Sequence, residues 1–191
     1  SYAYDLARRF GMKIVEPRPA LVPLTLGGDD VLFRELSGVS AEVIAKAGKG
    51  VFREAALFTH RGLSGPSILQ ISSYGRHGEA VSINFLPDDD AVSLLLEAKR
   101  ANPRATIRST LERQLPNRFA EALAARLAED RRLADVPDKW LDAAGDRLNK
   151  WVFHPNGTEG FAKAEVTIGG VSTDALSSKT MESRTVAGLY V

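Results

Sequence analysis

The residues best suited to chemistry lie between Thr59 and Pro66. A histidine, a cation and a hydroxyl, His60, Arg61 and Ser64, stand here among glycines. The apolar patterns on either side predict a strand, a turn and a helix that begins at Pro66 and is capped by Ser64. Unpaired N–H groups at a helix start attract an anion or an electron-rich ring edge. These three side chains are candidates for contact with a ligand, although a purely structural turn needs the same glycines, and both interpretations remain open from the residues alone.

Other catalytic constellations are weaker. The stretch Gly62–Gly65 lacks the residue that separates serine from the second glycine in a hydrolase elbow. The chain has no cysteine, and its histidines, His60, His77 and His154, follow no metal-ligand spacing. Neither of the glycine-rich phosphate-binding patterns occurs. We therefore predict no metal site, and no nucleotide fingerprint within this sequence.

A glycine pair marks a second candidate site. Gly169 and Gly170, followed by Val171, end an apolar strand-like run. Glycines at a strand end let the backbone approach something flat at close range, or simply permit a turn. Both interpretations remain open from the residues alone.

Composition limits the classes of partner. The 191 residues carry 25 Lys+Arg against 24 Asp+Glu, a net charge of +1, so no broad field gathers phosphate backbones or anionic lipid. We expect no nucleic-acid and no membrane partner, and a cytoplasmic location, since no signal peptide or spanning segment is recognisable. The helical pattern over Tyr2–Phe10 and the apolar run Gly188–Val191 look cut, so we expect an excised piece of a longer protein.

The first and last thirds of the chain favour β structure. Prolines in Lys13–Leu26 indicate extended chain. Short apolar or alternating runs predict strands further on. These runs are Val31–Leu36, Val39–Ala45, Val51–Phe58, Ala80–Leu86, Val152–Phe153 and Phe161–Ile168.

Helical spacing dominates the middle. Acidic residues after Pro87 cap a helix that ends near Ala101, and further helices are predicted over Thr106–Leu115, from Pro116, and over Lys139–Trp151. Trp140 and Trp151 lie on or near the apolar stripe of the last helix and are expected in the core.

The predicted fold class is α+β. An antiparallel β-barrel formed by residues 20–87 and 152–168 is interrupted by a small four-helix subdomain, residues 88–151, with one shared core. Residues 1–19 and 169–191 are expected to connect this unit to another part of a longer protein.

Four blocks of sequence resemble one family. They are Arg18–Leu24, Phe58–Pro66, Ala164–Val171, and Thr180–Arg184 together with the terminal Gly188–Val191. In this order and with these residues the chain resembles the bacterial NAD(P)/FAD-dependent oxidoreductases, the aminoacetone-oxidase-like flavoproteins that include bile-acid reductases. The resemblance implies that a barrel and helical subdomain are inserted into a Rossmann-like FAD domain whose phosphate-binding and closing segments lie outside this sequence.

The resemblance also implies a site. The turn Gly169, Gly170 and Val171, and the segment Thr180, Met181, Glu182 and Ser183, would return the chain to bound FAD, with His60, Arg61 and Ser64 facing the same cleft. The implied function is the substrate-cleft module of an enzyme that passes electrons between a small organic substrate or NAD(P)H and FAD. The piece alone is expected to be inactive. The alternative is a non-catalytic β-barrel binding module.

Overall fold

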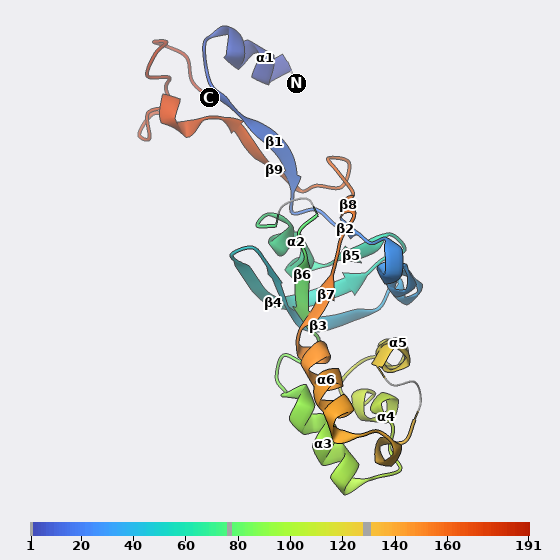
Figure 1. The fold of residues 1–191 in the computed structure, drawn as a ribbon. Helices are drawn as coiled ribbons and strands as arrows, with labels where there is room; N and C mark the ends of the chain where they lie inside the picture. Colours follow the sequence, from blue (N-terminus) through green and yellow to red (C-terminus); the bar gives the residue numbers. More distant parts are fainter. Residues whose placement is uncertain (1, 76–77, 128–130) are drawn as a thin grey trace.

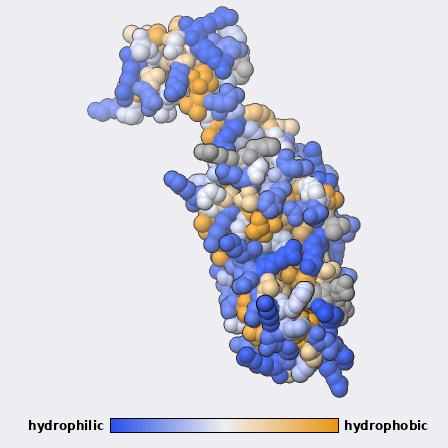
Figure 2. Space-filling model, in the orientation of Figure 1, coloured by the Kyte–Doolittle hydropathy of each residue, from blue (hydrophilic) through white to orange (hydrophobic). Residues whose placement is uncertain are grey.

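The molecule is elongated and has three parts in series. The computed structural model describes residues 2–75, 78–127 and 131–191. A small end holds both termini, a two-stranded ribbon leads from it to a larger sheet, and the helices α3 to α6 lie at the opposite end (Figure 1). A narrow waist separates the small end from the rest (Figure 2). No described helix is long and apolar enough to cross a membrane.

The larger sheet is antiparallel and has seven strands in the order β7-β6-β3-β4-β5-β2-β8. The strands are β2 Leu24–Thr25, β3 Ser40–Ala47, β4 Gly50–Phe58, β5 Gly62–Ser64, β6 Val81–Asn84, β7 Trp151–Phe153 and β8 Gly157–Thr158. Its edge strands β7 and β8 are consecutive in the chain, so the sheet must curve strongly. They do not pair with each other, and the predicted closed barrel is therefore an open one. The predicted α+β class is confirmed.

Helix α2, Pro66–Ser72, covers one side of the sheet and buries Ile68 and Ile71 completely. Farther along the sheet, fully buried aromatic rings from separate elements meet with centroids 4.8 to 6.2 Å apart, at the spacing of favourable ring pairs. This aromatic group consists of Phe33, Phe58, Phe85, Phe119, Trp151 and Phe153. Because Phe119 belongs to a helix of the far end, the core of the sheet and the core of the helices are continuous.

The strand predicted over Val31–Leu36 is wrong. Residues Gly28–Leu36 form a 3-10 helix, η1. Phe33 and Leu36 are its buried apolar residues, and their spacing of three matches the 3-10 period rather than the strand period of two. A short apolar run is compatible with either a strand or a helical turn, and here the packing of Phe33 against the aromatic group favours the helical turn.

Four α-helices and one 3-10 turn lie in the described part of the far end, residues 88–127 and 131–150. They are α3 Ala91–Ala101, α4 Ile107–Leu111, α5 Asn117–Leu127, η2 Leu133–Asp135 and α6 Asp138–Asn149. Side chains fix two of the starts. The Asp90 carboxylate accepts from Val92 N, and a hydrogen bond from the Ser93 hydroxyl lowers the pKa of Asp90. Thr106 and Ser109 form a capping box at α4. Helix α3 packs along α6, α4 packs against α5, and α3 also contacts α4. That these helices form one four-helix subdomain stays a prediction.

The two tryptophans differ. Trp151 is 2% exposed, as predicted, whereas Trp140 is 59% exposed and the expectation that it belongs to the core is wrong. The buried face of α6 runs through Leu141, Ala144 and Leu148, and Trp140 precedes this stripe by one residue, which turns it toward solvent.

The ribbon pairs β1, Ile14–Ala20, with β9, Val166–Val171. The strand predicted over Phe161–Ile168 therefore begins later, after a turn at 160–164, and belongs to the ribbon instead of the larger sheet. At the base of the ribbon Arg18 donates to the carbonyls of Ser73 and Gly75, just beyond α2. Beyond the ribbon, α1 Tyr2–Arg9 and η3 Thr173–Ala175 flank a small core of Ala7, Met12 and Leu176.

We expect Gly145→Ala to lower the free energy of unfolding by about 1–3 kcal/mol. In an unobstructed helix the same change stabilises by up to about 1 kcal/mol. Here a Cβ at Gly145 would lie 2.5 Å from the backbone N of Val92, so α3 and α6 would be forced apart. Urea unfolding measures the change, and a variant more stable than the wild type would contradict this contact.

Candidate functional site

The turn between β4 and β5 carries the predicted His60 and Arg61. The Thr59 hydroxyl oxygen accepts from the backbone N of Arg61 at 3.2 Å and from that of Gly62 at 3.0 Å. Gly62 has φ +156°, and a Cβ there would collide with the carbonyl of Leu24 in β2. The turn is thus tight, pressed against β2, and presents His60 and Arg61 to solvent.

Residues distant in sequence complete the surface around this turn. Arg61 Nη1 lies 3.4 Å from Glu159 Oε2; the Arg61 side chain is 55% exposed and that of Glu159 only 9%. Nearby on β2, the Thr25 hydroxyl donates to Asn156 Oδ1 at 2.6 Å. We call His60, Arg61, Thr25, Asn156 and Glu159 the β8 face, because the last two flank β8. The sequence analysis missed Thr25, Asn156 and Glu159, since only the fold brings them to the turn.

Ser64 does not cap α2. It lies in β5 opposite Leu57, and the residue before the helix is Gly65, with φ +89° and no side-chain cap. A Cβ at Gly65 would lie 2.8 Å from β4 backbone atoms, and the buried Ser67 donates to the Ala55 carbonyl. The first turn of α2 is therefore packed onto β4, and the anion site expected at its N–H groups is not open. Pro66 is the first helical residue, as predicted.

The glycine pair has a structural explanation within the ribbon. Gly170 lies opposite Val15, and Val171 opposite Ile14. Gly169 has φ +96°, and a Cβ there would lie 2.5 Å from the carbonyl oxygen of Glu16. Close approach of β1 alone accounts for glycine at 169, and a flavin contact by this turn stays a prediction.

The segment Thr180–Ser183 forms part of a compact loop at the small end. Ser183 is buried and its hydroxyl accepts from the backbone N of Val186, while Glu182 accepts from Gly188 N at 2.7 Å. Met181 is half exposed and has φ +60°. The ribbon separates this loop from the sheet that carries His60 (Figure 1). The structure thus does not bring the two predicted sets of site residues together.

The described residues supply no complete cofactor site. No group of three or more His, Asp and Glu that could hold a metal ion occurs among them. His154 lies outside the β8 face, and His77 lies outside the described residues. A cavity of about 510 Å³ beside the ribbon is lined by residues of α1, β1 and β9, including Tyr4 and Arg8, together with Phe161. It offers an open wall rather than an enclosed slot for a flavin ring.

Comparison with known proteins places this architecture. Residues 18–166 match the family model described as HI0933-like protein barrel and H2TH domain. The chain belongs to this HI0933-like family. The family is related to FAD-dependent oxidoreductases, so the resemblance to flavoproteins is confirmed at that level.

Three bacterial relatives carry names that describe enzymes. Two are named ribosomal RNA dihydrouridine synthase: one from Escherichia coli K12, 46% identical over 99% of this chain, and one from Haemophilus influenzae, 40% identical over 99%. The third is the 3-dehydro-bile acid delta(4,6)-reductase of Clostridium scindens, 29% identical over 98% of the chain. The alignments cover 48%, 48% and 49% of these relatives, so the chain spans about half their length.

We expect Thr59→Ala to loosen the β4–β5 turn and to lower the free energy of unfolding by about 1 kcal/mol. The backbone N of Arg61 loses the hydroxyl as acceptor, and that of Gly62 keeps only the Thr59 carbonyl. Thr59→Ser keeps the hydroxyl and serves as the matched control. Urea unfolding of both variants measures the effect. Equal loss in the two would assign the effect to the missing methyl group instead of the hydrogen bonds.

Proposed function

We propose that this chain is the barrel-and-helix module of an FAD-dependent oxidoreductase that reduces uridine in ribosomal RNA. The observation that carries the proposal is the 46% and 40% identity, over 99% of the chain, to two relatives named ribosomal RNA dihydrouridine synthase. An RNA substrate replaces our expectations of a small organic substrate and of no nucleic acid. The small organic substrate was implied by the family resemblance, and the absence of nucleic acid was inferred from the net charge of +1, which says nothing of local clusters of charge.

In this proposal most of the FAD site lies outside the chain. The described residues contain no phosphate-cradling loop, and the cavity beside the ribbon is open. When bound, FAD supplies the electron pair that saturates the uracil C5=C6 bond, with NAD(P)H as the source of electrons. Residues 1–19 and 169–191 connect to the flavin domain, residues 20–87 and 152–168 contain the barrel, and residues 88–151 form the helical subdomain. The last three residues of the barrel range, 166–168, lie in strand β9 of the ribbon. The module alone is inactive in this scheme.

The β8 face is the part of this module that we assign to the substrate. A base lifted out of an RNA fold needs hydrogen-bonding groups along its edge and a proton donor for the carbon that does not receive the hydride. Asn156, Arg61 and His60 supply an amide, a guanidinium and an imidazole. Ser64 lies on the adjoining strand β5, and a substrate contact by it remains part of the proposal.

A second candidate is reduction of a small conjugated ketone. The relative named 3-dehydro-bile acid delta(4,6)-reductase favours it. Its name and the name dihydrouridine synthase both describe saturation of a carbon–carbon double bond conjugated to a carbonyl. Its identity of 29% is lower than that of the two RNA-modifying relatives, so we rank it second.

We expect the purified full-length protein, with FAD and NADH or NADPH, to form dihydrouridine in an unmodified transcript of its own ribosomal RNA. Nuclease digestion and mass spectrometry measure a gain of two hydrogens per modified uridine. Free uridine and a 3-oxo-steroid with conjugated double bonds are the matched substrates. Reduction of the steroid without reduction of the RNA would select the second candidate. A protein without a flavin absorption spectrum after reconstitution would refute both.

A further inference from the structure

Two arginines are stacked on the aromatic group where the sheet meets the helices. The guanidinium carbon of Arg126, on α5, lies 4.2 Å from the centre of the Phe33 ring. That of Arg147, on α6, lies 4.2 Å from the centre of the Trp151 ring. The Phe33 and Trp151 rings meet edge to face at 5.6 Å. Two like charges are therefore held over neighbouring rings of one rigid, buried scaffold.

Hydrogen-bond donors in this region lack acceptors. Arg126 Nη1 donates to the carbonyl of Ala122 at 3.2 Å, but Nη2 is buried and has no acceptor among the described residues. Arg34, from η1, donates through Nη2 to the Leu26 carbonyl, while its Nε is likewise buried and unpaired within the described part of the chain. An unsatisfied buried N–H on a cation costs stability. Because these two nitrogens are closed off from solvent, an external phosphate would meet the exposed Arg147 and the partly exposed side of Arg126 instead.

The charges around Arg126 do not neutralise it. Burial lowers the pKa of Arg126, and repulsion by Arg147 lowers it further, against the opposing attraction of Asp30 and Glu35. Asp30 Oδ2 already accepts from the backbone N of His154. No carboxylate forms an ion pair with Arg126 or Arg147 in the described residues. The attraction of Asp30 on Arg126 exceeds the repulsion by Arg147, so what both guanidinium groups lack is an ion-pair partner, which an incoming anion would provide.

The chain connects this region directly to the β8 face. From Trp151 it runs through β7 to His154, which binds Asp30 of η1, and on to Asn156 and Glu159. The stacked arginines and the β8 face are thus joined by one short segment of chain, residues 151–159. The planar fork of a guanidinium pairs two N–H groups with two phosphate oxygens, a geometry that a lysine lacks.

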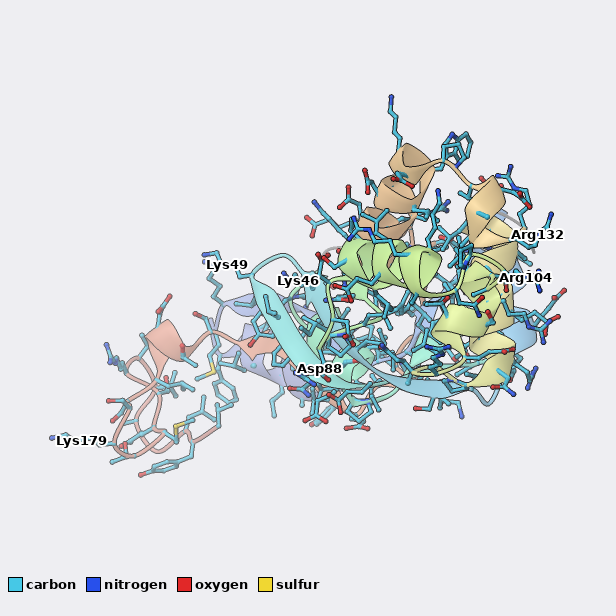
Figure 3. All side chains as sticks on the ribbon, turned by 90° about the horizontal axis from the view of Figure 1, so that it is seen from below. Lys46, Lys49, Asp88, Arg104, Arg132 and Lys179 are labelled. Atoms are coloured by element: carbon cyan, nitrogen blue, oxygen red, sulfur yellow. The ribbon has the colours of Figure 1, made fainter. Side chains whose placement is uncertain are left out.

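We propose that Arg126 and Arg147 bind a backbone phosphate of the RNA substrate; we call these two residues the arginine cluster. This inference rests on the proposed function. Several other cations are less suited, because they are exposed and are not stacked on the aromatic group. They include Arg104 and Arg132 on adjoining loops of the helical end, and Lys46 and Lys49 near the β3–β4 hairpin (Figure 3). They lie on the surface as ordinary solvated charges.

The test is binding of the full-length protein to its unmodified ribosomal RNA transcript, by filter binding over a series of salt concentrations. We expect Arg126→Met to weaken binding at least about tenfold and to reduce the slope of log affinity against log salt by about one. Arg126→Lys keeps the charge and should keep the slope while still losing several-fold in affinity. Arg113→Met, at an exposed arginine of the same helical end, is the control and should change affinity less than about twofold.

Thermal unfolding separates binding from folding. Arg126→Met removes a buried donor that lacks an acceptor, so we expect the melting temperature of the RNA-free protein to stay level or rise. Should this variant not fold, Arg147→Met, at an exposed position over Trp151, gives the same comparison.

Each outcome decides a different statement. Wild-type binding with equal binding by Arg126→Met and Arg147→Met would overturn the arginine cluster and leave the proposed function standing. A wild-type protein that neither binds nor modifies the RNA would overturn both. A third outcome is that millimolar inorganic phosphate raises the melting temperature of the wild type but not of Arg126→Met, while both variants keep their affinity for RNA. That outcome would assign the site to a small phosphate ligand and refute its role in RNA binding.

Discussion

The side-chain amide of Asn149 holds together the segments on which the rest of the structure depends. Its nitrogen lies 2.9 Å from Asn84 Oδ1 and 3.0 Å from the carbonyl of Asp89, and its oxygen accepts from Ala91 N at 2.8 Å. These partners are the end of β6 and the start of α3, where the chain enters the helical end, while Asn149 itself is where the chain leaves it. One amide therefore fixes entry and exit, and Trp151 follows two residues later into the aromatic group.

Local chemistry explains why much of the fold could be predicted. The helix beginning at Ala91 follows a capping aspartate, and Pro66 stands at the first position of α2. Both helix starts can therefore be predicted from a few neighbouring residues. The strands around Val39–Ala45 and Val51–Phe58 form the longest ladder of the sheet, β3 with β4. The predictions were wrong where neighbouring residues in the sequence do not determine the local structure. The packing of Phe33 favours the 3-10 helix η1, and β9 pairs with β1 instead of with the larger sheet.

The candidate site was only half accessible to sequence reasoning. His60 and Arg61 stand together in one turn and could be found by their types. Their partner Glu159 lies 98 positions along the chain from Arg61, and no periodicity encodes such a contact. The stacked arginines escaped for another reason. Arg126 follows the ordinary pattern of a charged helix face, and only the position of Phe33 beneath it makes it unusual.

The ribbon has a mechanical consequence. Two paired strands resist stretching along their length but bend readily across their faces, and nothing in the larger sheet pairs with this ribbon. Its register shifts between Val15 and Arg18, where the ladder is interrupted. Arg18 anchors the lower half to the end of α2. The interrupted stretch therefore divides the ribbon into a half that is tied to the end of α2 and a half that leads to the small end.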